Sequence, residues 1–139
     1  SACIFCQAAD RNLEYVLSVG EHVVVMLNRY PYTTGHLMVS PTRHVADLES
    51  MRDDEMWHLI ATLRACEAVL KREYRPHGLN VGLNLGSCAG AGIVGHLHVH
   101  LVPRWLGDTN FMPVTGDVRV IPESLDRTFE RLKPHFEEA

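Results

Sequence analysis

Short runs of apolar and β-branched residues recur along the chain and are typical of β-strands. Five segments have this pattern: Leu13–Val19, His22–Leu27, His36–Ser40, Leu79–Asn84 and His96–Pro103. The first two are separated by Gly20 and Glu21, a pair that favours a two-residue hairpin turn. The turn-rich segment Asn28–Gly35 predicts a loop before the third strand, and Pro41 is expected to end that strand.

A helical period replaces this pattern in the middle and at the end of the chain. The middle segment begins with residues 50–53, Ser-Met-Arg-Asp, which are typical of a helix start, and it is expected to reach about Tyr74, before Pro76 and Gly78. Its apolar positions at helical spacing are Met56, Ile60, Leu63 and Leu70, widened by Trp57 and Val69. The last helix is predicted by Leu125, Phe129, Leu132 and Phe136. Pro134 is expected to stop or kink it.

The order of these elements predicts the fold class α+β, with a mainly antiparallel five-stranded sheet, one long central helix and a C-terminal helix. We expect a single domain over residues 1–139, because no repeat, low-complexity stretch or linker interrupts the chain. A length of 139 residues, 46% apolar and 22% charged, suits one core that needs no disulfide framework. The net charge of −4 argues against broad binding to nucleic acid or an anionic membrane, but it allows a small phosphorylated ligand.

Three of the nine histidines alternate with aliphatic residues in the run from His96 to Val102. In a strand, this alternation places the three imidazoles on one face and the aliphatic side chains on the other. A solvated strand face would normally mix Thr, Lys and Glu, so the histidines indicate either metal binding or a nucleophilic or general-base imidazole. The glycine-rich segment Gly86–Gly95 directly before them can offer backbone N–H groups to phosphate oxygens. Together these features indicate phosphoryl or nucleotidyl transfer.

Two of the four cysteines, Cys3 and Cys6, form a C-x-x-C pair. In a reducing compartment such a pair more often binds metal or performs redox chemistry than forms a structural disulfide, the alternative being two incidental cysteines. Ser1–Asp10 has no basic run followed by an apolar stretch, and no window reaches the roughly 18 apolar residues of a membrane span. We therefore expect a cytoplasmic protein without a targeting segment.

With these motifs, the sequence resembles the histidine triad (HIT) family, whose signature His-φ-His-φ-His-φ-φ, with φ apolar, is met by His96–Val102. The resemblance covers nearly the whole chain, because further motifs occur in the family's order: CIFC, the segment Asn28–His36, PTRH, GLNVGLNLG and HLHVHLVPRW. AGAGIVGHLHVHLVPRW followed by GDTNFMPV looks most like bacterial diadenosine tetraphosphate phosphorylases. Family members are usually homodimers, which implies a homodimer here, through the exposed face of the long helix or the end of the sheet.

The resemblance also implies a catalytic role for three histidines. His98 would attack the α-phosphorus of an adenine (di)nucleotide such as diadenosine tetraphosphate and form a nucleotidyl-histidine intermediate. The other nitrogen of such a nucleophile must be hydrogen-bonded, and a strand carbonyl is well placed for that bond. His100 would face the phosphate or the leaving group, and His36 would complete the cluster.

Further residues match the family's binding positions. The implied nucleotide contacts are Asn28 at the ribose, Asn84, Ala91 and Gly92 at phosphate, and Trp105 at a base or the pocket wall. Gly92 departs from many HIT hydrolases, which carry Gln or another hydrogen-bonding side chain there, so backbone donors would have to replace that side chain. The implied ligands of a closed, structural zinc site are Cys3, Cys6, His44 and His96. Arg43 and Arg104 are additional candidates for attracting phosphate.

The sequence leaves several functions of this site open. Water as the acceptor would make the protein a hydrolase, and inorganic phosphate would make it a phosphorylase. The alternatives are a nucleoside phosphoramidate hydrolase of the same family or a nucleotide-binding module without turnover. A metallohydrolase with His96, His98 and His100 as ligands is disfavoured, because alternate positions on one strand spread over about 13 Å.

Overall fold

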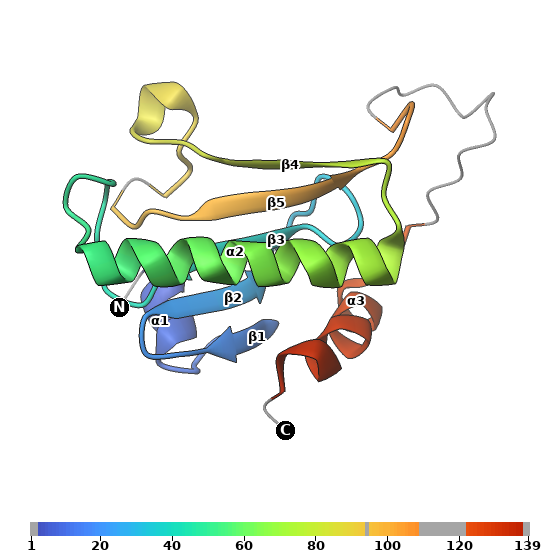
Figure 1. Cartoon of the computed structure of the whole chain (residues 1–139), viewed down its shortest axis with the longest axis horizontal. Helices are drawn as coiled ribbons and strands as arrows, with labels where there is room; N and C mark the ends of the chain where they lie inside the picture. Colours follow the sequence, from blue (N-terminus) through green and yellow to red (C-terminus); the bar gives the residue numbers. More distant parts are fainter. Residues whose placement is uncertain (1–2, 94, 109–121, 138–139) are drawn as a thin grey trace.

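A five-stranded antiparallel sheet organises the chain, with the strand order β1-β2-β3-β5-β4 (Figure 1). The strands of this computed structural model are β1 Val16–Val19, β2 Val23–Leu27, β3 Leu37–Pro41, β4 Gly78–Leu83 and β5 Val99–Arg104. The helices are α1 Ile4–Ala9, α2 Asp53–Tyr74 and α3 Leu125–Leu132, with short 3₁₀ helices at Ser87–Ala89 and Lys133–Phe136. The predicted fold class is confirmed, and α1 is an addition to it.

The structure describes residues 3–93, 95–108 and 122–137. Most of the GDTNFMPV segment, from residue 109 onward, therefore lies outside the described residues. Within the described ranges, no helix has the length and apolar character that crossing a membrane requires.

Two apolar clusters, one on each face of the sheet, hold the helices in place. Because side chains alternate along a strand, Val23 and Val25 of β2 face one cluster and Val24 and Met26 face the other. Helix α2 lies across the first face (Figure 1), where it buries Leu59, Cys66 and Leu70. Helix α1 packs on the second face, in a cluster formed by Phe5, Ala8, Val24, Met26 and Met38. The alternation predicted for the histidine segment is confirmed, since the first cluster also contains Leu97, Val99 and Leu101. The strand itself was predicted to start too early, because β5 begins at Val99 and His96–His98 precede it.

Helix α2 begins two residues later than the start signal at Ser50 suggests, and its first half buries other residues than predicted. Arg52 is the N-cap residue, and its backbone N–H donates to Oε1 of Glu55 at 2.8 Å. The buried residues of the helix are Glu55, Leu59, Cys66 and Leu70. Three predicted core residues are instead exposed: Met56 by 38%, Trp57 by 65% and Ile60 by 58%. The predicted stripe is confirmed at Leu63, Val69 and Leu70, which lie in or against the core. It was wrong in the first half of the helix, because an apolar surface and an apolar core have the same helical period.

A buried ion pair fastens the start of α2 to the segment after β3. Glu55 is only 2% exposed, and it accepts hydrogen bonds from Nε and Nη2 of Arg43 at 2.9 and 2.7 Å. The Arg43 hydrogen bond is the main reason that the pKa of Glu55 falls to about 2. Arg43 also donates to the Ser50 carbonyl. Residues 43–50, which include His44, are therefore held at both ends.

Strand boundaries differ from the predictions where the backbone bends. β1 begins at Val16 because Tyr15 has a left-handed φ of 66°. Gly20 N–H donates to the Val23 carbonyl at 2.9 Å, so the hairpin link lies at residues 21–22, one position later than predicted. At the other end of the chain, α3 stops at Leu132 and a 3₁₀ helix follows, which confirms the break expected from Pro134.

Candidate functional site

The three predicted catalytic histidines lie together on the α1 side of β3 and β5. The antiparallel register pairs Met38 of β3 with His100 of β5, which brings His36, just before β3, close to His100. His36 Nε2 and His100 Nδ1 are 2.8 Å apart, and the rings of His98 and His100 meet edge to face at 5.0 Å. His36 is 2% exposed and His98 is 7% exposed. The fold therefore assembles imidazoles that are more than 60 positions apart in sequence.

Hydrogen bonds determine which nitrogen of His36 and His100 carries the proton. Burial lowers the pKa of His36 to about 4 and also lowers the pKa of His100, so both rings are neutral near pH 7. The backbone N–H of Tyr32 donates to His36 Nδ1 at 3.1 Å, which places the His36 proton on Nε2. His36 Nε2–H then donates to His100 Nδ1. His100 consequently carries its proton on Nε2 and can donate it to a ligand.

His98 has the opposite tautomer. Its Nδ1–H donates to the backbone carbonyl of His96 at 3.0 Å, as expected for a nucleophilic imidazole on this strand. The lone pair therefore lies on Nε2, the nitrogen that can attack an electrophile. The arrangement places an acceptor on His98 beside a donor on His100, which suits attack on a phosphate whose oxygens need a hydrogen-bond donor.

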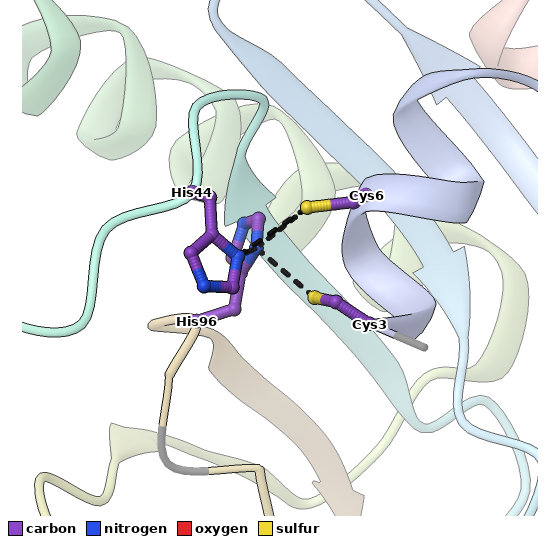
Figure 2. A group of neighbouring side chains, drawn as sticks. All are labelled: Cys3, Cys6, His44 and His96. Atoms are coloured by element: carbon purple, nitrogen blue, oxygen red, sulfur yellow. Dashed lines mark hydrogen bonds between the residues drawn. The ribbon is translucent and has the colours of Figure 1, made fainter. Parts of the chain in front are cut away.

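The four predicted metal ligands also come together, as Figure 2 shows. The ligand atoms of Cys3, Cys6, His44 and His96 lie within 4.8 Å of one another. His96 Nε2–H donates to the Pro41 carbonyl at 2.8 Å, which leaves the lone pair on Nδ1, 3.3 Å from Cys3 Sγ. Two thiols and two imidazoles form a donor set that zinc favours. Among the described residues, this is the only group of three or more such donors that converges in this way.

This geometry contradicts the metallohydrolase alternative. His96 turns Nδ1 towards the cysteines, whereas His98 uses Nδ1 to bind the His96 carbonyl. Within the part of the chain that the structure describes, His96, His98 and His100 form no common metal-binding group. The triad is divided between two sites, with His96 in the cysteine cluster and the other two in the imidazole cluster.

The candidate nucleotide contacts lie at different distances from the histidines. Asn28 is adjacent to them, with Nδ2 3.3 Å from His36 Nε2. In the glycine-rich loop, Asn84 Nδ2 lies 3.5 Å from the Gly90 carbonyl, and a Cβ at Gly92 would meet no atom within 4 Å. Trp105 follows the opposite end of β5, about 20 Å along the strand from His98. In a single chain, the indole of Trp105 therefore does not lie at the imidazole cluster.

Neither candidate arginine is available for phosphate. Arg43 binds Glu55 with two nitrogens, and Arg104 binds both carboxylate oxygens of Asp108 at 2.9 and 2.8 Å. Each guanidinium thus stabilises a turn of the chain.

Sequence reasoning missed two aromatic residues of the site. Tyr32 is 70% exposed, its backbone fixes the His36 tautomer, and its ring lies 4.5 Å from the His36 ring. Phe5 stacks on His98 with ring centroids 4.6 Å apart. Only the position of Phe5 between two cysteines pointed to the site, because neither residue has reactive chemistry of its own.

The neutral state of His36 predicts a loss of stability in mild acid. Its pKa of about 4 in the folded protein lies below the ordinary 6.5, so the unfolded chain takes up the proton first. We expect the free energy of unfolding to fall by about 3 kcal/mol between about pH 6.5 and pH 4 on account of this residue. Urea unfolding across this range measures the change. His36→Gln should reduce it and His58→Gln, on the exposed surface of α2, should not; an undiminished loss in His36→Gln would contradict the prediction.

Comparisons with known proteins agree with the fold and the motifs. A family model described as the HIT domain matches residues 12–105. An AP-4-A phosphorylase of Mycobacterium tuberculosis is 50% identical over 113 residues, 81% of this chain and 58% of that protein. The chain therefore spans less than two thirds of the length of this relative. An uncharacterized HIT-like protein of Saccharolobus solfataricus is 31% identical over 111 residues, 79% of each chain.

Solved structures give the same result. A hypothetical histidine triad nucleotide-binding protein from Sulfolobus tokodaii matches with a TM-score of 0.75 and 27% identity, covering 96% of this chain and 88% of that one. A HIT family protein from Bacillus anthracis matches with a TM-score of 0.72 and 30% identity, covering 84% of this chain and 83% of the other. Sequence, fold and the arrangement of the histidines together show that this chain belongs to the histidine triad family.

Proposed function

We propose that the protein cleaves a phosphoanhydride bond of adenine dinucleotides such as diadenosine tetraphosphate and transfers the adenylyl group through His98 to inorganic phosphate. The observation that carries this proposal is the 3.0 Å hydrogen bond from His98 Nδ1 to the His96 carbonyl, which leaves Nε2 unprotonated beside His100. The name of the 50% identical relative, AP-4-A phosphorylase, supports the substrate class and the acceptor.

The first step would form a covalent intermediate. His98 Nε2 bonds to the α-phosphorus, and the bond from that phosphorus to the bridging oxygen breaks, so the electron pair leaves with ATP. His100 Nε2–H donates to a phosphate oxygen as charge develops there. His36 holds that proton in place, because its own Nε2–H occupies His100 Nδ1. Backbone N–H groups of the loop Gly86–Gly95 would bind the remaining phosphate oxygens.

The second step would return the enzyme to its starting state. An oxygen of inorganic phosphate attacks the same phosphorus, the bond to His98 breaks, and Nε2 recovers its lone pair. The product of this step is ADP, whereas water as the acceptor would give AMP. The identity of the second nucleotide therefore reports the acceptor.

Product analysis tests both the acceptor and the nucleophile. With phosphate we expect ADP and ATP from diadenosine tetraphosphate, and without phosphate no ADP. His98→Ala should lower the rate roughly a thousandfold or more and trap no labelled nucleotide. His58→Ala, on the exposed surface of α2, should keep the wild-type rate. The same products with and without phosphate would exclude a phosphorylase, and an active His98→Ala would exclude the covalent route.

We also infer that Cys3, Cys6, His44 and His96 hold a structural zinc ion. The support is the convergence of two thiols and two imidazoles, together with the His96 tautomer that turns Nδ1 towards them. A zinc ion bound there would supply a cross-link between α1, the segment after β3 and the start of β5. Four protein ligands complete a tetrahedral shell, which leaves no position for substrate.

Zinc content and thermal stability test this site. We expect about one zinc per chain in the wild type and a large loss in Cys6→Ser, because structural zinc contributes directly to folding. The melting temperature of Cys6→Ser should fall towards that of chelator-treated wild type. Cys88→Ser is the matched control, since Cys88 is exposed and outside the cluster. Zinc retained at the wild-type level by Cys6→Ser would refute the assignment.

We further propose that two copies associate through the exposed apolar residues of α2 and the outer strand β4. Met56, Trp57 and Ile60 are exposed on α2, and Val81 on β4 is exposed by 51%. Because β4 is the last strand of the sheet, one of its edges can pair with another chain. Burial of these side chains would remove apolar surface from water.

Measurement of the oligomeric state tests this proposal. Light scattering coupled to size exclusion should give a dimer for the wild type and a monomer for Trp57→Glu, because a carboxylate would be desolvated in the contact. Tyr30→Glu alters an aromatic residue that is 85% exposed elsewhere, and it should stay dimeric. A monomeric wild type, or a dimeric Trp57→Glu, would count against the contact.

A further inference from the structure

The ring of Phe5 joins the cysteine cluster to His98. Phe5 lies between Cys3 and Cys6 on α1 and is fully buried. Its ring stacks on the His98 imidazole, with centroids 4.6 Å apart and planes 24° apart. The same ring lies 5.3 Å from the ring of His96. One side chain therefore contacts both a candidate metal ligand and the proposed nucleophile.

The stacking supplies a constraint that the hydrogen bond of His98 does not. A bond from Nδ1 to the His96 carbonyl fixes one ring atom but allows the ring plane to turn about it. Phe5 packs against one face of the imidazole, and His100 meets it at 71°, so the plane is fixed as well. Since Nε2 is the attacking atom, a turn of the ring would move it away from the phosphorus.

The position of Phe5 depends in turn on the cysteine cluster. Helix α1 has six residues and no side-chain cap at Cys3, and so short a helix is unstable by itself. Two sets of contacts hold it: burial of Phe5 and Ala8 in the second apolar cluster, and the approach of Cys6 Sγ to His44 Nδ1 at 3.3 Å. Loss of the cysteine contacts would remove one of the restraints that keep the ring on His98.

We propose that Phe5 is a positioning residue for His98 and that the cysteine–histidine cluster influences catalysis through it. This inference rests on the proposed role of His98 as nucleophile. Replacement of the ring by an aliphatic side chain should slow the chemical step and leave nucleotide affinity unchanged, because the apolar cluster against which Ile93 of the loop packs stays filled. The expected signature is a fall in kcat without a matching rise in KM.

Three variants separate positioning from general destabilisation. Phe5→Leu removes the ring but keeps an apolar side chain, Phe5→Tyr keeps the ring, and Val24→Ala disturbs the same apolar cluster. We expect Phe5→Leu to lower kcat for diadenosine tetraphosphate about 10–100-fold, the range for a misplaced reacting group. AMP affinity by calorimetry and zinc content should remain near wild type. Phe5→Tyr should retain most of the activity, and Val24→Ala should lower the melting temperature while keeping kcat.

A double variant tests the connection to the cysteines. Cys6→Ser should lower kcat alone, but it should add little in the Phe5→Leu background if both act through the same ring. Wild-type kcat in Phe5→Leu, an equal loss in Val24→Ala, or multiplying losses in the double variant would each overturn the inference. If Phe5→Leu does not fold, Phe5→Met replaces it in the same design. An active His98→Ala would instead overturn the proposed function, so the two failures are distinguishable.

Discussion

His96 uses three polar atoms to connect the end of β3, the cysteines of α1 and His98. Its Nε2–H donates to the carbonyl at the end of β3, its Nδ1 faces the cysteines of α1, and its own carbonyl accepts a hydrogen bond from Nδ1–H of His98. The residue is completely buried, so all three bonds form away from competing water. Rotation of the His96 ring would disturb the cysteine–histidine cluster, and a shift of its backbone would release His98. The orientation of His98, the proposed nucleophile, therefore depends on this one residue.

The overall fold could be predicted because it depends on patterns that the sequence shows directly. Alternation located all five strands, and Pro134 marked the end of α3. Boundaries were missed where a single backbone conformation decides them, as at Tyr15. The first half of the buried stripe of α2 was missed because Trp57 and Ile60 have the hydrophobicity of core residues but lie on the outer face of the helix. Helix α1 was missed because six residues are too few to show a period.

The site was predictable to the extent that its residues carry distinctive chemistry. The residue type and spacing of the histidines and cysteines identified them as candidates. The structure brings together the three catalytic candidates and the four ligand candidates. The tautomers depend on partners such as the Tyr32 backbone and the His96 carbonyl, which only the fold provides. Phe5 could not be predicted because its contribution is a surface of contact and not a reactive group. Arg43 and Arg104 were wrong candidates for the opposite reason. Their charge suggested phosphate binding, but ion pairs with Glu55 and Asp108 neutralise that charge.

The Cys3 thiol contacts an imidazole 93 positions away along the chain, and this separation has a consequence for folding. Closing so long a loop carries a large entropic cost, and contacts of this range form late on the folding route. The stacking of Phe5 on His98 spans a similar separation. Partly folded chains, even with the hairpin and α2 already formed, would then lack the stacked and hydrogen-bonded arrangement of His98. The reactivity proposed for His98 would belong only to the completed domain.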